Sequence, residues 1–227
     1  MSHTMLGRQI EAVLFDLDGT LVDTAPDLAA ALNATLAHNG LKSLTYDEIR
    51  PIVSNGADAL IVLGFGSELN AIKQKELKAH FISFYQQHIA DKSVLFEGMS
   101  DLLNHFEKHH MPWGIVTNKP EYLTTPLLEK MSLNTRAACV VCGDQVKNTK
   151  PHPESIYLAC QQINISPDKA VYMGDAERDI RAGRLAGLTT VACRYGYIPN
   201  GDNINDWQAD ISISSAAELL DFLHVTQ

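Results

Sequence analysis

The chain has 227 residues, of which 45% are hydrophobic and 20% are charged, and its formal net charge is −9 at pH 7. This length accommodates one α/β domain with a smaller inserted domain but not two large domains, and the composition is typical of a globular protein. The acidic charge disfavours a nucleic-acid partner, and no apolar run approaches the roughly 20 residues of a membrane-spanning helix.

The cysteines and the N-terminus indicate the cellular compartment. Cys139, Cys142, Cys160 and Cys193 sit in or beside apolar segments, a pattern typical of reduced thiols in an intracellular core. The CxxC of Cys139 and Cys142 lies in "AACVVC", which predicts a buried strand with these residues on opposite faces, so core packing is favoured over metal or redox chemistry. The N-terminus lacks the apolar stretch of a signal peptide. We therefore expect a cytoplasmic protein.

Short apolar runs, often β-branched, recur along the chain, and each is followed by turn residues and then a helical pattern. These runs are Glu11–Phe15, Trp113–Thr117, Ala138–Cys142, Ala170–Met173 and Thr189–Cys193. Strands that alternate with helices are typical of parallel sheets with crossover connections. The sequence therefore predicts an α/β fold with a doubly wound, Rossmann-like parallel sheet.

The interval between the first two predicted strands is too long for a single crossover, and its pattern is helical throughout. The segment 24–40 predicts a helix with Thr24 as N-cap and Gly40 near the C-cap. The segment 45–66 predicts two short helices separated at "SNG", and 70–90 predicts a long amphipathic helix. We expect a helical cap domain over residues 20–96, inserted into an α/β core formed by residues 1–19 and 97–227.

Charged and hydrogen-bonding residues follow four of the predicted strands, where a parallel sheet binds ligands. They are Asp16 and Asp18, then Thr117, Asn118 and Lys119, then Lys150, and finally Gly174, Asp175 and Asp179. Converging carboxylates form a hard oxygen site that suits Mg²⁺, and the Thr, Asn and Lys side chains suit a phosphate group. Two neighbouring carboxylates then have a chemical use, since one attacks phosphorus and the other transfers a proton.

The motifs "DLDGT", "VTNK", "KP" and "GDAERD" resemble, in order, the four motifs of the haloacid dehalogenase superfamily, in the branch with a helical cap after the first motif. The resemblance covers nearly the whole chain. It implies that Asp16 is the nucleophile that forms an aspartyl-phosphate and that Asp18 is the general acid and then the base. It further implies that Thr117, Asn118 and Lys150 surround the phosphoryl group.

The same resemblance implies Mg²⁺ as the cofactor. Asp16, the backbone carbonyl of Asp18 and Asp175 are the implied metal ligands. Asp179 is expected to bind through a metal-bound water or to orient Lys150. Each aspartate alone is also compatible with a turn or a helix cap, but their joint placement favours the active site.

Substrate selection is expected to fall to residues outside the four motifs. Arg50, Ser54, Asn55 and Gly56 lie at the break between two cap helices, where free N–H groups face an anion or hydroxyl, although an ordinary Asn-Gly turn explains them equally well. Tyr195 and Tyr197 lie in a long polar loop after the fifth strand, with Trp207, where they either meet substrate or pin the loop to the core. For Lys119, a substrate contact and a solvated side chain are both open.

The segments "WGIVTNKP", "VSNGADAL" and "YGYIPNGDNINDWQAD" resemble bacterial phosphoglycolate phosphatases and look most similar to the N-acetylmuramic acid 6-phosphate phosphatases of cell-wall recycling. We therefore expect a phosphatase that hydrolyses a small-molecule phosphate ester, 2-phosphoglycolate or N-acetylmuramic acid 6-phosphate. The chain is expected to act as a monomer or weak homodimer without a nucleic-acid or membrane partner. His105 and His109 have a zinc-compatible spacing, but the sequence places no third ligand beside them.

Three other activities fit the sequence less well than a phosphatase does. A sugar phosphomutase of the same fold needs cap groups that hold a bisphosphate, and the cap break offers one basic residue, Arg50. A phospho-accepting receiver module carries its phosphorylated aspartate after a later strand and has no inserted helical domain. A dehalogenase has no use for Asp18 or Mg²⁺ in displacing halide from carbon. Closure of the cap over the sheet edge is a further hypothesis.

Overall fold

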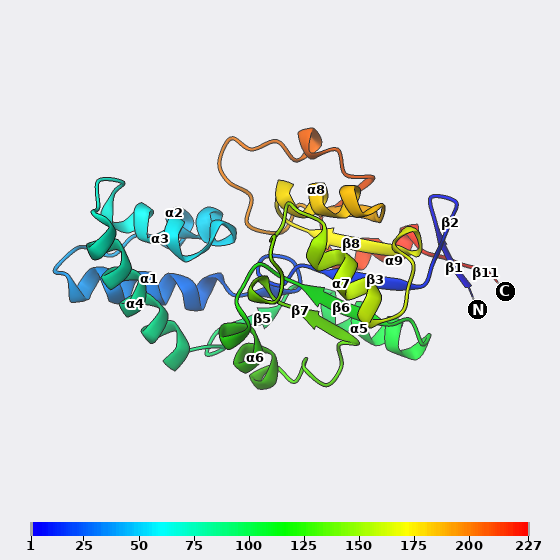
Figure 1. The fold of residues 1–227 in the computed structure, drawn as a ribbon, viewed down its shortest axis with the longest axis horizontal. Coiled ribbons are helices and arrows are strands. Elements are labelled where there is room, and N and C mark those ends of the chain that lie inside the picture. Colours follow the sequence, from blue (N-terminus) through cyan, green and yellow to red (C-terminus); the bar gives the residue numbers. More distant parts are fainter. Residues whose placement is uncertain (1, 227) are drawn as a thin grey trace.

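A six-stranded parallel sheet forms the centre of the structure, a computed structural model that describes residues 2–226 (Figure 1). Its strands, in spatial order, are β10 (Ile211–Ile213), β9 (Thr189–Cys193), β8 (Ala170–Gly174), β3 (Ala12–Phe15), β6 (Trp113–Val116) and β7 (Cys139–Val141). This order confirms the predicted doubly wound sheet and places β3 between β8 and β6. The residues that follow these three strands therefore meet at one edge.

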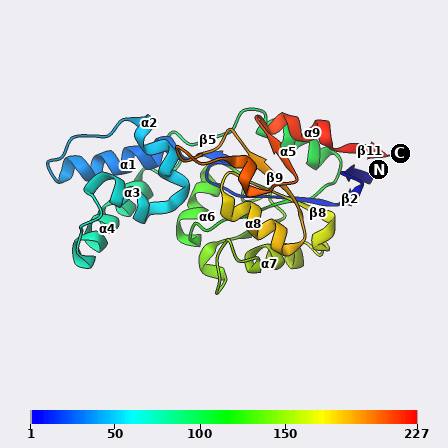
Figure 2. The same cartoon turned by 90° about the horizontal axis from the view of Figure 1, so that it is seen from above.

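Helices cover both faces of this sheet, because alternate strand residues point to opposite sides. Val13 and Phe15 of β3 belong to the hydrophobic cluster shared with α5 (Met99–Lys108) and α6 (Glu121–Lys130). Ala12 and Leu14 belong to the cluster shared with α7 (Glu154–Gln162) and α8 (Glu177–Ala186). Figure 2 shows α5 and α9 (Leu219–Phe222) on one side of the strands and α7 and α8 on the other.

The remaining helices form a separate group at one end of the molecule (Figures 1 and 2). They are α1 (Ala25–His38), α2 (Tyr46–Ile49), α3 (Gly56–Phe65) and α4 (Ala71–Gln87), with a 3₁₀ turn over Arg50–Asn55 between α2 and α3. A two-stranded antiparallel ribbon of β4 (Val22–Asp23) and β5 (Val94–Leu95) connects this group to the sheet. The break predicted at "SNG" falls where the 3₁₀ turn ends and α3 begins.

Some elements of the structure were not predicted from the sequence. β1 (Ser2–Met5), β2 (Arg8–Ile10) and β11 (His224–Thr226) form a small antiparallel sheet, and β10 extends the main sheet. Unlike the predicted strands, these short strands contain no continuous apolar run, and β1 and β11 come from opposite ends of the chain. Short 3₁₀ turns span Gly143–Gln145, Pro167–Lys169, Ile204–Trp207 and Ala216–Glu218.

The four cysteines are buried and unpaired, as predicted for core thiols. Burial raises the pKa of Cys139 to about 12 and that of Cys142 to about 11, so both remain thiols at neutral pH. Among the helices of residues 2–226, none is both long enough and apolar enough to cross a membrane.

The connection between α4 and β5 depends on a buried carboxylate in the first turn of α1. Asp27 is 2% exposed and accepts hydrogen bonds from the Lys92 N–H (3.0 Å), the Ser93 N–H (2.9 Å) and the Ser93 hydroxyl (2.6 Å). These bonds fasten the chain that returns from the helical group to the helix that enters it.

We expect Asp27→Ala to lower the free energy of unfolding by about 2–4 kcal/mol, because it leaves the buried N–H and hydroxyl of Ser93 without an acceptor. Urea denaturation followed by circular dichroism measures this change. Asp101→Ala is the matched control, since Asp101 also lies in the first turn of a helix, α5, but is exposed. Equal losses in the two variants would contradict a specific role for Asp27.

Candidate active site

The loop after β3 brings its residues close to the end of β8. Gly19 has φ +90°, and a Cβ atom there would lie 2.1 Å from Asp175 Oδ2 and 2.8 Å from the Tyr197 ring. The loop passes Asp175 only because residue 19 has no side chain. Asp16 and Asp18 lie just before Gly19 in the chain, so this close approach keeps the segment that carries both carboxylates near the edge of the sheet.

Three buried carboxylates meet at this edge. Asp16 follows β3, Asp175 follows β8, and Asp179 lies in the first turn of α8, where its Oδ2 accepts a hydrogen bond from the Ala176 N–H (3.1 Å). One oxygen from each of Asp16, Asp175 and Asp179 lies within 4.8 Å of the others. Burial, together with the neighbouring carboxylates, raises the pKa of Asp16 to about 7 and that of Asp175 to about 6. Such a cluster of hard oxygen donors fits a divalent cation, which would neutralise it.

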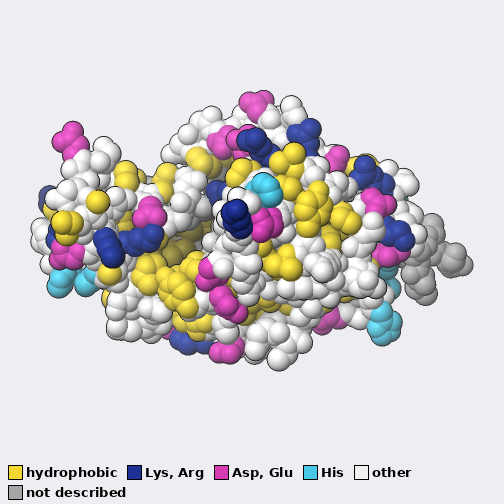
Figure 3. Space-filling model, in the orientation of Figure 1, with side chains coloured by type: hydrophobic (Ala, Val, Ile, Leu, Met, Phe, Trp, Pro, Cys, Tyr) yellow, Lys and Arg dark blue, Asp and Glu magenta, His cyan; other side chains and the backbone are white. Residues whose placement is uncertain are grey.

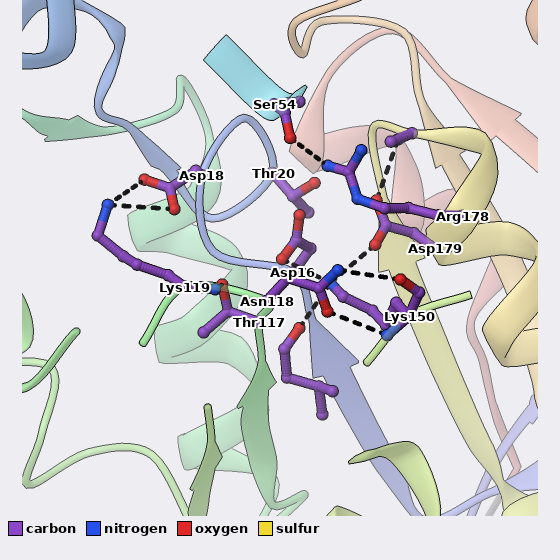
Figure 4. A network of polar contacts seen from close by, with 12 residues as sticks. Asp16, Asp18, Thr20, Ser54, Thr117, Asn118, Lys119, Lys150, Arg178 and Asp179 are labelled. Atoms are coloured by element: carbon purple, nitrogen blue, oxygen red, sulfur yellow. Dashed lines mark hydrogen bonds and ion pairs between the residues drawn. The ribbon is translucent and has the colours of Figure 1, made fainter. Parts of the chain in front are cut away.

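Lys150 supplies a positive charge inside this cluster (Figure 4). Its Nζ atom lies 2.8 Å from Asp16 Oδ1 and 2.7 Å from Asp179 Oδ1, and it also donates to the Val116 carbonyl (3.0 Å) and the Tyr172 hydroxyl (2.8 Å). Burial alone would lower the pKa of Lys150, but the carboxylates of Asp16 and Asp179 outweigh burial and raise it. The ammonium group therefore remains charged and points at the Asp16 carboxylate.

Asn118 positions the main chain of Lys150. Its side-chain amide donates to the Lys150 carbonyl (3.0 Å), and its Oδ1 atom accepts from the Lys150 N–H (3.0 Å). The Asn118 side chain, which was predicted to bind phosphate, therefore hydrogen-bonds to the main chain of Lys150 instead. Thr117 is buried at the end of β6, and its oxygen accepts from the Lys119 N–H (3.1 Å), which leaves the hydroxyl proton for an acceptor in the cavity.

Asp18 forms an ion pair with a different lysine from the one that contacts Asp16. Lys119 Nζ lies 3.0 Å from Asp18 Oδ1, and the Thr24 hydroxyl donates to the same oxygen (2.5 Å). In Figure 4 this pair lies to one side of Asp16 and Lys150. The Lys119 side chain is 8% exposed and lies 4.7 Å from the centre of the Tyr85 ring. Burial lowers the pKa of Lys119, but Asp18 raises it by more, so Lys119 is a buried cation rather than a solvated side chain.

The helical group reaches the carboxylates through Ser54. The Ser54 hydroxyl donates to Asp175 Oδ2 (2.9 Å). The Ser54 carbonyl accepts a hydrogen bond from Arg178 of α8 (2.6 Å), which is drawn in Figure 4. Ser54 lines the same cavity as its neighbours Asn55 and Gly56. Arg178 was not singled out in the sequence, because an arginine in a charged helix is typical of an exposed face. The signal available was its place between two motif aspartates.

Arg50, Tyr195 and Tyr197 lie outside this cavity, and each is engaged in holding the helical group to the core. Arg50 donates to the carbonyls of Gly196 (3.0 Å) and Tyr195 (2.8 Å) and lies 5.0 Å from the centre of the Tyr197 ring. The Tyr197 hydroxyl accepts from the Ala25 N–H (2.9 Å), and the Tyr195 hydroxyl donates to the Thr20 carbonyl (3.1 Å). The loop after β9 is thus pinned at the start of α1.

A cavity of about 440 Å³ separates the helical group from the core. Asp16, Asp18, Thr117 and Lys150 line one end of it. Apolar side chains line much of the remainder, and Figure 3 shows them in the hollow between the helical group and the core. The apolar lining includes Leu28, Val53, Leu60, Phe81, Ile82 and Leu123. A ligand with its anionic end at the carboxylates would place the rest of its structure against this apolar wall.

The chain belongs to the haloacid dehalogenase-like hydrolase family, which matches residues 13–193. It is 44% identical over 211 residues to an N-acetylmuramic acid 6-phosphate phosphatase of Pseudomonas putida, covering 93% of this chain and 95% of that protein. A phosphoglycolate phosphatase of Xanthomonas campestris is 39% identical over 208 residues, covering 92% and 94%. The crystal structure of a predicted phosphoglycolate phosphatase from Haemophilus somnus has a TM-score of 0.84 at 27% identity, covering 93% and 97%. These similarities confirm the family predicted from the four motifs.

Replacing Lys150 should destabilise the metal-free protein. In Lys150→Met the buried carboxylates of Asp16 and Asp179 lose their cation, so we expect the free energy of unfolding to fall by about 3–5 kcal/mol. Urea denaturation in a chelator measures it. Lys169→Met is the control, because Lys169 forms an ion pair with Glu11 at the surface (2.7 Å) and its loss should change stability little. A small effect at Lys150 would mean that the cluster does not depend on its charge.

Proposed function

We propose that the chain is a Mg²⁺-dependent phosphomonoester hydrolase that acts through an aspartyl-phosphate on Asp16. One observation carries this proposal: a buried carboxylate, Asp16, and a second carboxylate, Asp18, line the same cavity, and each is paired with its own lysine. The arrangement provides a nucleophile and a separate proton-transfer group two residues apart. The relatives named as phosphatases support the same reaction.

The first half-reaction transfers the phosphoryl group to the protein. An Asp16 oxygen attacks phosphorus, and the bond between phosphorus and the ester oxygen breaks as Asp18 gives that oxygen a proton. Lys150 and the Thr117 hydroxyl stabilise the negative charge on the phosphoryl oxygens. In the second half-reaction Asp18 takes a proton from a water molecule, which attacks phosphorus and releases Asp16 and inorganic phosphate.

The proposed metal ligands are Asp16, the backbone carbonyl of Asp18, and Asp175, with Asp179 alongside. Mg²⁺ bound there would offset the charge of the carboxylates and of the phosphate ester, so that an anionic nucleophile can approach an anionic substrate. Ser54 and Thr20 donate hydrogen bonds to the two oxygens of Asp175 (2.9 and 3.3 Å) and hold it in place.

Residues 20–96 are proposed to act as the cap that selects the leaving group, since Ser54, Asn55 and Gly56 lie on the cavity wall. The proposed substrate is a small phosphorylated metabolite, N-acetylmuramic acid 6-phosphate or 2-phosphoglycolate. A phosphomutase has less support, because Arg50, the cap cation that would hold a second phosphate, is committed to the loop after β9.

The test of the proposed function is phosphate release from a panel of esters: N-acetylmuramic acid 6-phosphate, 2-phosphoglycolate, hexose phosphates and nucleotides. We expect Asp16→Asn to reduce turnover of the best substrate by at least about 10⁴-fold, because an amide is a poor nucleophile. Asp101→Asn, on the exposed face of α5, is the control and should retain full turnover. Failure of the wild type to release phosphate from any ester would refute the proposal.

Metal binding can be tested separately from activity. A cation that binds only the folded chain, at about 100 times its dissociation constant, stabilises it by about 2.7 kcal/mol and raises Tm by roughly 5–10 °C at this length. We expect Mg²⁺ to give a rise of this size in the wild type and less than half of it in Asp175→Asn. Both proteins are first stripped of bound metal with a chelator. Differential scanning calorimetry at increasing Mg²⁺ concentrations then measures the rise in Tm of each. The same rise in both proteins would exclude Asp175 as a ligand.

A further inference from the structure

The cavity has a second basic end, which the proposed chemistry does not use. Lys78 of α4 lines the cavity, as do Phe81, Ile82 and Tyr85, and these residues share one face of the helix because they are spaced by three, four and seven positions. Tyr85 marks the end near the chemistry, since its ring lies against Lys119 beside Asp18. Seven residues of α-helix correspond to roughly 10 Å, so Lys78 lies about that far along the axis from Tyr85.

Lys78 differs from the other two lysines of the cavity in its availability for a ligand. Lys119 and Lys150 are buried and paired with Asp18 and with Asp16, so a ligand cannot take them without uncovering a buried carboxylate. Lys78 Nζ lies 2.7 Å from Asp58 Oδ2 of α3, and the two side chains are 42% and 60% exposed. An ion pair this exposed contributes little stability, so an incoming anion can replace Asp58 as the partner of Lys78.

The cavity wall between these two ends is apolar. Val53, Leu60, Phe81 and Ile82 lie on it, and Figure 3 shows the hydrophobic surface in the hollow with basic side chains at its margin. Along this face of α4 the order is therefore Tyr85 beside the phosphate-binding end, then Ile82 and Phe81, and then the half-exposed cation of Lys78. This order is complementary to a ligand with an anion at each end and a less polar body between them.

We propose that Lys78 is a specificity-determining residue that binds a carboxylate on the leaving group, at the end remote from the phosphate. The inference rests on the proposed phosphatase function, because it takes the phosphate to lie at Asp16. The inference defines the substrate class as phosphomonoesters that carry a second anionic group at the end of the molecule remote from the phosphate.

This substrate class separates the two candidate substrates. N-acetylmuramic acid 6-phosphate carries its carboxylate on a lactyl ether at C3, two ring positions away from C5, the carbon that bears the phosphorylated hydroxymethyl group. In 2-phosphoglycolate a single carbon separates the carboxylate from the ester oxygen, so that carboxylate stays beside the phosphate and cannot reach Lys78. The geometry therefore favours the amino-sugar acid.

The test compares two substrates that differ only in the lactyl ether: N-acetylmuramic acid 6-phosphate and N-acetylglucosamine 6-phosphate. We expect Lys78→Gln to lower kcat/KM for the muramic ester about tenfold, mainly through KM, because a charge-assisted hydrogen bond is lost. The glucosamine ester should change less than twofold. Lys78→Arg should retain most of the preference. Lys75→Gln, on the exposed side of the same helix, is the matched control and should change neither substrate.

The outcomes distinguish this inference from the proposed function. If the wild type hydrolyses neither ester nor any other in the panel, the phosphatase proposal fails. If it hydrolyses both esters equally well, or 2-phosphoglycolate best, the role of Lys78 is overturned while the phosphatase stands. Equal losses for both esters in Lys78→Gln would also overturn it, since they would show that the residue supports the cap structure rather than binding the carboxylate.

Discussion

The contact of one buried lysine with two of three buried carboxylates determines much of the surrounding structure. Lys150 reaches Asp16 and Asp179 at 2.8 and 2.7 Å, while burial raises the pKa values of Asp16 and Asp175. Carboxylates so close together are stable only with compensating charge and donated hydrogen bonds. The fold supplies both, because β3 and β8 are parallel neighbours whose carboxyl ends deliver Asp16 and Asp175 to the same point.

Close approach of the main chain to these carboxylates also explains three glycines, of which Gly19 and Gly174 lie in the motifs. A Cβ atom at Gly19 or Gly196 would overlap with Asp175, and one at Gly174 would lie 2.2 Å from Asp179 Cβ. The main chain therefore packs directly against the acidic side chains. A motif such as "DLDGT" combines a chemical requirement for its aspartates with a steric requirement for its glycine.

Two aspartates separated by one residue can have opposite tasks because they occupy different electrostatic surroundings. Asp16 faces Lys150 and the other buried carboxylates, whereas Asp18 faces Lys119 and the Thr24 hydroxyl. Thr24 immediately precedes α1, so Asp18 is hydrogen-bonded to the residue at which the first helix of the helical group begins. A displacement of that helix would alter the Thr24 bond to Asp18, whereas the partner of Asp16, Lys150, belongs to a different part of the chain.

Sequence patterns were sufficient for the features that repeat or that carry chemistry. The buried strands were predicted because parallel strands are continuous apolar runs, and the meeting of Asp16, Asp175 and Asp179 at one edge was expected because polar residues follow four of these strands. Position along the chain gave no information on what Arg50, Tyr195 and Tyr197 contact, because their partners lie more than a hundred residues away. For Asn118, residue type suggested an anion ligand, but its amide is used by Lys150.

Sequence alone also could not distinguish Lys78 from its neighbouring lysines. In "KQKELKAHF" it is one of three similar lysines, and an exposed helix face explains all of them equally well. Only the packing of α4 against the cavity distinguishes it, by aligning it with Phe81, Ile82 and Tyr85. None of these residues belongs to the edge of the sheet where phosphate chemistry is proposed. Substitutions along this face can therefore change which leaving group is accepted while the carboxylates and lysines of the core stay the same.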